Sequence, residues 1–173
     1  MNEIIKNILE RRSIKKYKND KVDEKLIDEI LKAGTYAPSG MNDQSPIIVA
    51  ITNKEIRDKL SKINAKIMGI DTDPFYGAPV VLVVLADKSC PTYVYDGSLV
   101  IENMMLAANS LGLGSCWIHR AKEEFETEEG KEILKSLGIE GNYEGIGNCI
   151  IGYPDGEKPE AKPRKENYIY IIN

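Results

Sequence analysis

Apolar residues recur every three or four positions over much of the chain, which is the spacing that gives a helix one apolar face. The first such segment ends at Arg11, and a second is expected between Asp23, which can cap a helix, and Gly34, which is placed to end it in a left-handed turn. Further helices are expected over 54–67, 96–111 and 127–137. The helix at 96–111 carries few charges, so it is expected to lie in the core.

Short runs rich in β-branched residues predict strands between these helices. Ile47–Ile51 and Val80–Ala86 are apolar throughout, so both strands are expected to be buried on two faces. Two further strands are expected at Cys116–His119 and Ile146–Tyr153. Proline, serine, glycine and asparagine between residues 37 and 44 predict an irregular loop. The chain is therefore expected to combine helices with a sheet in one fold.

The C-terminal segment 154–173 differs from the rest of the chain in composition. Residues 154–166 are rich in proline and charge and are expected to run over the surface as an extended arm. Tyr168–Ile172 alternates in a β-prone pattern and predicts a final strand. This strand either joins the sheet of a partner subunit and covers its edge, or forms an edge strand in its own subunit. Residues 1–173 are expected to form a single domain, because no repeat or linker divides them.

The composition is that of an ordinary globular chain of 173 residues. No apolar stretch is long enough to cross a bilayer, and charged residues interrupt the N-terminal segment, so neither an anchor nor a signal peptide is expected. The three cysteines are odd in number and widely spaced, which argues against disulfides, a thiolate metal site and an iron–sulfur cluster. A cytoplasmic location is therefore expected.

Charge and motif content exclude several classes of function. The net charge of −4 argues against a nucleic-acid surface, although residues 1–25 hold eight Lys or Arg against five Asp or Glu. There is one histidine, His119, and no GxSxG, HExxH or P-loop motif. Gly-x-Gly pairs at 112–114 and 145–147 lack the third glycine of a dinucleotide fingerprint. No catalytic residue and no metal ligand is assigned.

Two basic clusters remain as candidates for binding an anion. Arg11, Arg12, Ser13 and Lys15 follow the first helix and offer guanidinium, hydroxyl and ammonium donors suited to phosphate. Lys162–Lys165 in the arm forms a second cluster, free to fold back and clamp the same phosphate. The alternatives are a basic helix end and a solubilising tail, both exposed to solvent.

Four pieces of the sequence resemble the nitroreductase family in order and spacing. They are Arg11-Arg12-Ser13-x-Lys15, Ala37-Pro38-Ser39-Gly40-x-Asn42-x-Gln44, Leu111-Gly112-Leu113-Gly114-Ser115-Cys116-Trp117 and Lys162-Pro163-Arg164. The resemblance implies an α+β fold whose mixed, mainly antiparallel central sheet is flanked by helices, with the C-terminal strand exchanged in a homodimer. It also implies bound FMN and an NADH or NADPH electron donor.

The same resemblance assigns FMN-binding roles to individual residues. The phosphate would be bound by Arg11, Ser13, Lys162 and Arg164, and the ribityl chain and pyrimidine edge by Arg12 and Lys15. The loop residues Pro38, Ser39, Gly40, Asn42 and Gln44 would contact the isoalloxazine and ribityl groups, in part from the partner subunit. Gly114 and Ser115 would bring the backbone close to the ring.

The chain also departs from the family pattern. Gln44 is followed by Ser45-Pro46 where the family often has Pro-Trp, so an aromatic wall of the pocket is missing. Trp117 is expected to fill the core, Cys116 to be a small buried residue, and His119 to make structural hydrogen bonds.

The reaction implied by the resemblance is a ping-pong transfer of hydride through flavin N5. Reduced nicotinamide would deliver the hydride and leave, and a small oxidised acceptor such as a nitroaromatic or a quinone would then take the electrons. No acid or base from the protein is required. A non-catalytic FMN-binding protein for storage or sensing, and a dimeric interaction module, are the alternatives; neither nucleic acid nor a membrane is expected as a partner.

Overall fold

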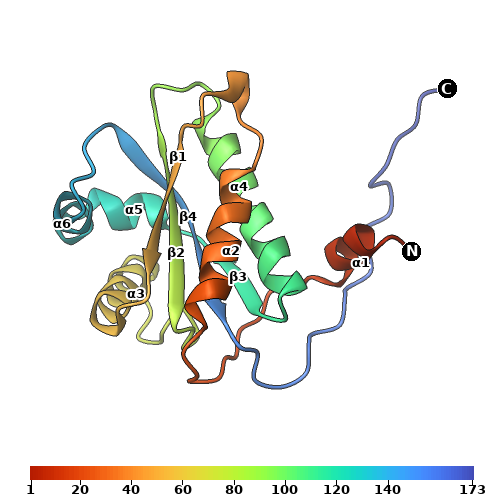
Figure 1. Ribbon diagram of the computed structural model, residues 1–173, viewed down its shortest axis with the longest axis horizontal. Coiled ribbons are helices and arrows are strands. Elements are labelled where there is room, and N and C mark those ends of the chain that lie inside the picture. Colours follow the sequence, from red (N-terminus) through yellow and green to blue (C-terminus); the bar gives the residue numbers. More distant parts are fainter.

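A four-stranded antiparallel sheet in the order β1-β2-β4-β3 forms the centre of the computed structural model, which describes residues 1–173 (Figure 1). Its strands are β1 (Pro46–Ile51), β2 (Val80–Asp87), β3 (Gly114–Ile118) and β4 (Tyr143–Gly152). Helices cover both faces of the sheet (Figure 1). The expected α+β fold with an antiparallel sheet is confirmed.

The helices form two layers. On one side of the sheet lie α2 (Glu24–Thr35) and α4 (Tyr93–Ser110), and on the other lie α3 (Lys54–Met68), α5 (Ala121–Glu126) and α6 (Glu128–Ser136). The core helix expected at 96–111 is confirmed as α4, whose buried face includes Ile101 and Met104. None of the helices is both long and apolar enough to span a membrane.

The position of each strand in the sheet decides how much of it is buried. Along β2, Val81 and Val83 belong to one core and Leu82 and Val84 to the other, because successive side chains point to opposite faces. The prediction of two buried faces is therefore confirmed for β2. It is wrong for β1, where Ala50 is exposed, because β1 lies at the edge of the sheet.

Two helices differ in detail from the sequence patterns. Gly34 does not end α2: it lies inside the helix, which continues to Thr35, and a Cβ there would come within 2.8 Å of Met104 Cγ on α4. Gly34 therefore permits close packing of α2 on α4 instead of a left-handed turn. The helix α5 was not predicted, because the sequence pattern indicated a helix only from Thr127 onward. Thr127 separates α5 from α6.

The helix α3 buries polar side chains. Its expected apolar stripe is only partly used, since Ile56 and Ile67 are 39% and 37% exposed. Leu60 of this stripe is buried, and the polar residues Arg57 and Asn64 are buried beside it. Hydrophobic spacing cannot detect this face, because its polar members are satisfied by partners from distant segments.

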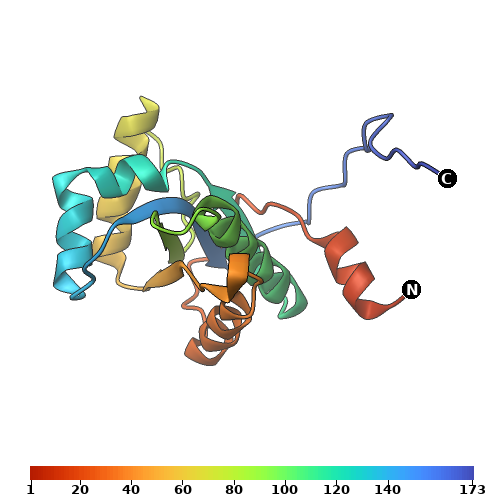
Figure 2. The ribbon, with the colours of Figure 1, turned by 90° about the horizontal axis from the view of Figure 1, so that it is seen from above.

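Both ends of the chain project from the body. The helix α1 (Glu3–Glu10) buries none of its residues, and every residue from Glu157 to the C-terminus is exposed to solvent (Figure 2). The expected strand Tyr168–Ile172 has no secondary structure and pairs with no strand of its own chain. An edge strand within the same subunit is therefore wrong, and exchange between subunits stays a prediction.

Candidate functional site

Residues that follow α1 lie against the edge of β3. Ser13 forms a parallel bridge with Ser115, and the Ile14 amide donates to the Ser115 carbonyl at 2.9 Å. A Cβ at Gly114 would come within 2.9 Å of the Ile14 side chain, so glycine is needed for this close approach. The structure thus brings together Ser13, Gly114 and Ser115, which the sequence assigned to one site.

Arg11 carries buried donors that have no acceptor. Its Nε and Nη1 atoms are buried and make no hydrogen bond, and Nε lies 3.7 Å from Glu102 Oε1. Buried guanidinium donors without acceptors carry an energetic penalty, and phosphate oxygens match their fork geometry. Arg11 beside Ser13 therefore fits the phosphate of a mononucleotide.

Arg12 and Lys15 lie differently from each other. Arg12 Nη1 donates to the Leu9 and Arg11 carbonyls, both at 2.7 Å, so this side chain caps the end of α1. The Lys15 ammonium stands over the Tyr76 ring, 5.4 Å from its centroid, and faces a cavity. Of the two, only Lys15 is presented to that cavity.

A cavity of about 320 Å³ extends from Ser13 and Lys15 along the end of β3. The other residues around it come from the end of α3 and the segment after it, and from β3 and the turn after it: Met68, Ile70, Thr72, Asp73, Pro74, Tyr76, Cys116, Trp117, Ile118, His119 and Arg120. Polar and apolar side chains contribute about equally to its lining, and Ser13, Lys15, Asp73, His119 and Arg120 give it several charged or hydrogen-bonding groups.

Three sequence interpretations concern the wall of this cavity. Cys116 is buried as expected, and burial raises the pKa of its thiol. The expectation of a core Trp117 is wrong, because the ring is 44% exposed at the edge of the sheet and a Cβ at Gly147 would overlap with it. The His119 imidazole is exposed and makes no hydrogen bond; only its carbonyl accepts one, from Asn64 Nδ2 at 2.9 Å.

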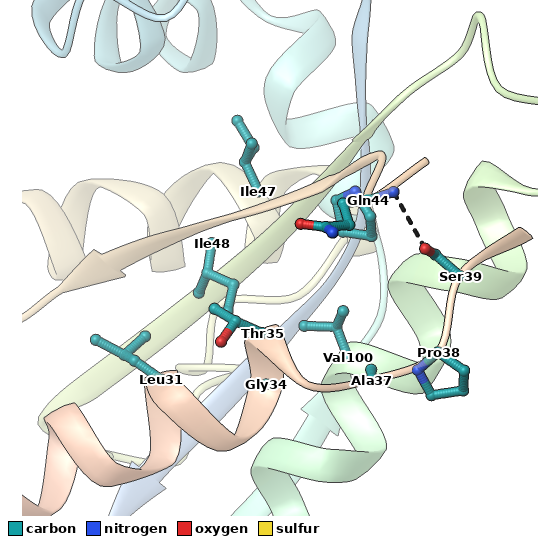
Figure 3. Close-up of a pocket in the computed structure, with 11 residues that line it drawn as sticks. Leu31, Gly34, Thr35, Ala37, Pro38, Ser39, Gln44, Ile47, Ile48 and Val100 are labelled. Carbon is teal, nitrogen blue, oxygen red and sulfur yellow. Dashed lines mark hydrogen bonds between the residues drawn. The ribbon is translucent and has the colours of Figure 1, made fainter. Parts of the chain in front are cut away.

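The loop after α2 borders a second cavity, of about 380 Å³, between α2, β1 and α4 (Figure 3). Pro38, Ser39 and Gln44 line it, and the backbone N–H of Gln44 donates to Ser39 Oγ at 3.1 Å. Leu31, Ile48 and other aliphatic side chains form the rest of the wall. A flat ring can lie against such a surface.

Three non-glycine residues of this loop have left-handed backbone conformations. Met41, Asn42 and Gln44 have φ values of 52°, 60° and 50°. Asn tolerates this conformation, but for Met41 and Gln44 it costs about 1 kcal/mol or more each, and such conformations persist where the surrounding structure holds them. The loop is therefore preorganised and not merely irregular.

Asp96 holds the loop in place. Its carboxylate is 2% exposed and accepts hydrogen bonds from the Gly40 amide at 3.0 Å, Ser45 Oγ at 3.0 Å and Thr92 Oγ1 at 2.9 Å. This role was not predicted from the sequence. A carboxylate at the start of a helix with few charges, which was expected to lie in the core, was the signal that could have revealed it.

The assigned residues form separate groups within one chain. The cavity beside Ser13 and the cavity beside Ser39 share no residue. Lys162 and Arg164 are exposed, and the only hydrogen bond of the Arg164 guanidinium is to the Lys162 carbonyl. Lys158 instead connects the arm to α1 and α4: its Nζ donates to the Glu10 carbonyl at 3.1 Å and to Asn109 Oδ1 at 2.9 Å.

Comparison with known proteins decides the family. A model of the nitroreductase family matches residues 8–153. The chain belongs to the nitroreductase family. The resemblance to this family is thereby confirmed, and three of the four sequence motifs lie within the matched residues; Lys162-Pro163-Arg164 lies beyond them.

Individual relatives of this nitroreductase-family chain agree with the assignment. A protein of Archaeoglobus fulgidus named NADH dehydrogenase/NAD(P)H nitroreductase is 34% identical over 91% of the chain and 89% of its own length. The crystal structure of a nitroreductase with bound FMN from Bacteroides fragilis superposes with a TM-score of 0.89 at 30% identity, covering all of both chains. A nitroreductase with bound FMN from Desulfitobacterium hafniense gives 0.87 at 28% identity, covering 99% and 100%.

The nitroreductase-family chain also contains a buried polar network behind the first cavity. Glu124 is 0% exposed, and its carboxylate accepts hydrogen bonds from Asn64 Nδ2 and from Asn148 Nδ2, the latter at 3.1 and 2.9 Å. Burial raises the pKa of Glu124 to about 7 despite these bonds. Nothing in the local pattern announced this network, because Glu123 and Glu126 beside it look equally suited to solvent.

Proposed function

We propose that this chain is an FMN-dependent NAD(P)H oxidoreductase that works as a homodimer. The observation that carries the proposal concerns Arg11. Its Nε and Nη1 atoms are buried without a hydrogen-bond acceptor, close in the chain to Ser13, which pairs with Ser115. Two solved relatives contain bound FMN, and the Archaeoglobus relative is named for NAD(P)H nitroreductase activity, which supports both the cofactor and the electron donor.

In this proposal each residue group has a distinct task. Arg11 and Ser13 would bind the phosphate, and Lys162 and Arg164 of the exposed arm would join them. Lys15 places a positive charge at the pyrimidine edge, where it favours a reduced ring. When bound, FMN supplies the capacity to accept hydride from a nicotinamide and to pass electrons to a second molecule.

The loop 38–44 completes the site from the other subunit. Within one chain its cavity is separate from that of Ser13 and Lys15, so a single subunit holds two halves of a site. Two subunits related by a twofold axis would pair each half with its complement. Within one chain, the loop held by Asp96 lies apart from the phosphate donors, and dimerisation would bring the two groups together.

The apolar surface of the projecting segments supports the homodimer. Ile4, Ile5, Ile8 and Leu9 on α1 are all exposed, as is the C-terminal Tyr168–Ile172. A contiguous apolar face of this kind is unfavourable in water and marks an interaction surface. Both segments lie on the same side of the body (Figure 2). They would wrap around a second copy.

The sheet has one free edge to receive the exchanged strand. The outer edge of β3 is already contacted by Ser13 and Ile14, whereas the outer edge of β1 has no partner. An unpaired edge attracts another strand, and Tyr168–Ile172 is a strand-forming segment without a partner. We infer that it adds to β1 (Pro46–Ile51) of the other subunit.

The acceptor is a small oxidised molecule such as a nitroaromatic or a quinone, reduced in ping-pong order. All three cysteines are free, which supports the proposed cytoplasmic setting. The test is an anaerobic absorption titration of the purified protein with NADH and with NADPH, followed by addition of a nitroaromatic. Bleaching and recovery of a bound flavin are expected. A flavin that neither nucleotide bleaches would favour a storage or sensing protein, and a colourless protein that takes up no FMN would overturn the proposal.

A further inference from the structure

Arg120 lines the cavity of Ser13 and Lys15, and the flavin-binding assignment gives it no part. Its φ is 80°, in the left-handed region that a residue with a side chain adopts at a cost of about 1 kcal/mol or more. Conformations of this kind persist only where the surroundings hold them, and they are concentrated at functional sites. The strained backbone of Arg120 therefore suggests that the residue has a functional role.

The backbone around Arg120 is held from two helices. Asn64 on α3 donates from Nδ2 to the His119 carbonyl at 2.9 Å, and the Glu124 amide on α5 donates to the Arg120 carbonyl at 2.9 Å. Asn64 is itself completely buried and is bound by the Glu124 carboxylate. The turn that carries Arg120 is thus fixed by a buried network and not by the cavity surface.

The guanidinium of Arg120 is oriented through Nε, and neither of its terminal nitrogens donates to an oxygen. Nε donates to Asn64 Oδ1 at 3.1 Å, and Nη2 lies 3.1 Å from Met68 Sδ, which is a weak acceptor. Arg120 has no ion pair, and the nearby Glu124 carboxylate is occupied by Asn64 and Asn148. A cation held in one orientation with free N–H groups on a cavity wall is suited to a carboxylate, which a guanidinium binds with two parallel hydrogen bonds.

The strand β3 separates Arg120 from the phosphate donors. Ser13 pairs with Ser115, and β3 then runs on to Ile118, about 10 Å at roughly 3.3 Å per residue. Arg120 follows two residues later. The two ends of this wall therefore present different cations, Lys15 beside Ser13 at one end and Arg120 at the other.

We propose that Arg120 is a specificity-determining residue that binds the carboxylate of an anionic aromatic acceptor. This assignment rests on the oxidoreductase function proposed above. Met68, Tyr76 and Trp117 around the same cavity supply apolar and aromatic surface for the flat body of such a molecule. A neutral aromatic would use that surface equally well but would leave the guanidinium unpaired.

Benzoate and benzamide test the assignment without any turnover, because they share shape and differ in charge. Their binding to the FMN-loaded protein is followed through the flavin absorption spectrum. The unaltered protein is expected to bind benzoate roughly tenfold to a hundredfold more tightly than benzamide, the ratio that one charge-assisted hydrogen bond provides. Equal affinities for the two compounds would overturn the proposal.

Arg120→Gly is the informative variant, because glycine relieves the left-handed backbone while removing the side chain. It is expected to retain FMN and to bind benzoate and benzamide equally. Arg120→Lys keeps the charge but loses the fork and is expected to show an intermediate ratio. Lys62→Ala removes a charge from an exposed position of α3 and serves as the control; it should leave the ratio unchanged. A preference for benzoate that survives in Arg120→Gly would refute the role of Arg120.

Turnover supplies a second, independent measurement. The ratio of kcat/KM for 4-nitrobenzoate to that for 4-nitrobenzamide should fall in Arg120→Gly by a similar factor, mainly through KM for the anion. An equal loss with both acceptors would show that Arg120 acts on the flavin and not on the acceptor, and would overturn the proposal.

Failure of the proposed oxidoreductase function would give a different result from failure of the Arg120 assignment. A protein without flavin or nicotinamide oxidation would sink the oxidoreductase proposal, whereas intact bleaching with equal ratios would sink only this inference. Trp117 is the single tryptophan and lines the same cavity, so its fluorescence reports benzoate binding even in flavin-free protein. Quenching by benzoate that depends on Arg120 would then still support the anion site, and its absence would end it.

Discussion

The Asp96 carboxylate on α4 accepts a hydrogen bond of 3.0 Å from the backbone amide of Gly40, and this contact joins the core of the molecule to the loop 38–44. The two residues are far apart in the sequence. Their contact makes the loop an extension of the core helix, since the same carboxylate also holds Ser45.

Replacing Asp96 is expected to release this loop. Asp96→Ala leaves the Gly40 amide and the Ser45 hydroxyl without an acceptor, which should lower the free energy of unfolding by about 2–4 kcal/mol, as measured by urea denaturation. Flavin retention should fall as well, because Ser39 and Gln44 lose their position. Thr92→Val removes one donor to the same carboxylate and is the milder control. Unchanged stability and flavin retention in Asp96→Ala would contradict the anchoring role.

Arg11 and Arg164 are expected to hold the FMN phosphate together. The double replacement Arg11→Ala and Arg164→Ala should weaken FMN binding at least about a hundredfold, because two charge-assisted hydrogen bonds of roughly 1.5–3 kcal/mol each are removed. Equilibrium dialysis with FMN measures the change. Lys6→Ala on the exposed face of α1 is the matched charge control. Flavin retention as strong as in the unaltered protein would refute the phosphate assignment.

Glu124 should make stability depend on pH. Its pKa is about 7 in the folded chain against an ordinary 4.5, so the folded state holds the proton more tightly than the unfolded state. The contribution is fully present below pH 4.5, declines as pH rises, and is lost above about pH 7, a change of roughly 3 kcal/mol. Urea unfolding of the unaltered protein and of Glu124→Gln at pH 4.5 and pH 8 measures it.

The comparison with Glu124→Gln isolates this carboxyl from all others. The stability difference between the two proteins should move against the unaltered protein as pH rises from 4.5 to 8. Asn148 Oδ1 is buried without a partner, so rotation of that amide can supply an acceptor for the glutamine or for protonated Glu124. A difference that is the same at both pH values would show that Glu124 does not titrate in this range.

The C-terminal segment should be required for the dimer. Ile169→Pro together with Ile171→Pro removes two backbone donors from the exchanged strand, and dissociation into monomers is expected in sedimentation experiments. Glu160→Pro lies in the arm before this strand and should have no such effect. A double variant that sediments as the same dimer as the unaltered chain would exclude pairing of Tyr168–Ile172 with β1.

The sequence alone determined the elements whose identity depends on local pattern. Val80–Ala86 is apolar at every position, so a strand was predictable, and the 96–111 segment predicted a core helix because its apolar residues recur at helical spacing with few charges. Burial of both faces did not follow from the pattern, because Ile47–Ile51 is equally apolar and Ala50 is exposed. Short motifs such as Arg11-Arg12-Ser13 and Pro38-Ser39-Gly40 led to the family because their residues are adjacent in the sequence and can be read without knowing the fold.

Only the tertiary structure decided which polar residues act together. Asp96 with Gly40, and Glu124 with Asn64, join residues more than fifty positions apart, and hydrogen bonds of this kind leave no periodicity in the chain. The same holds for the exposed Trp117, whose environment depends on β3 being at the edge of the sheet. Periodicity records how a segment meets a generic apolar core, whereas a binding site depends on particular partners that the fold brings from distant segments.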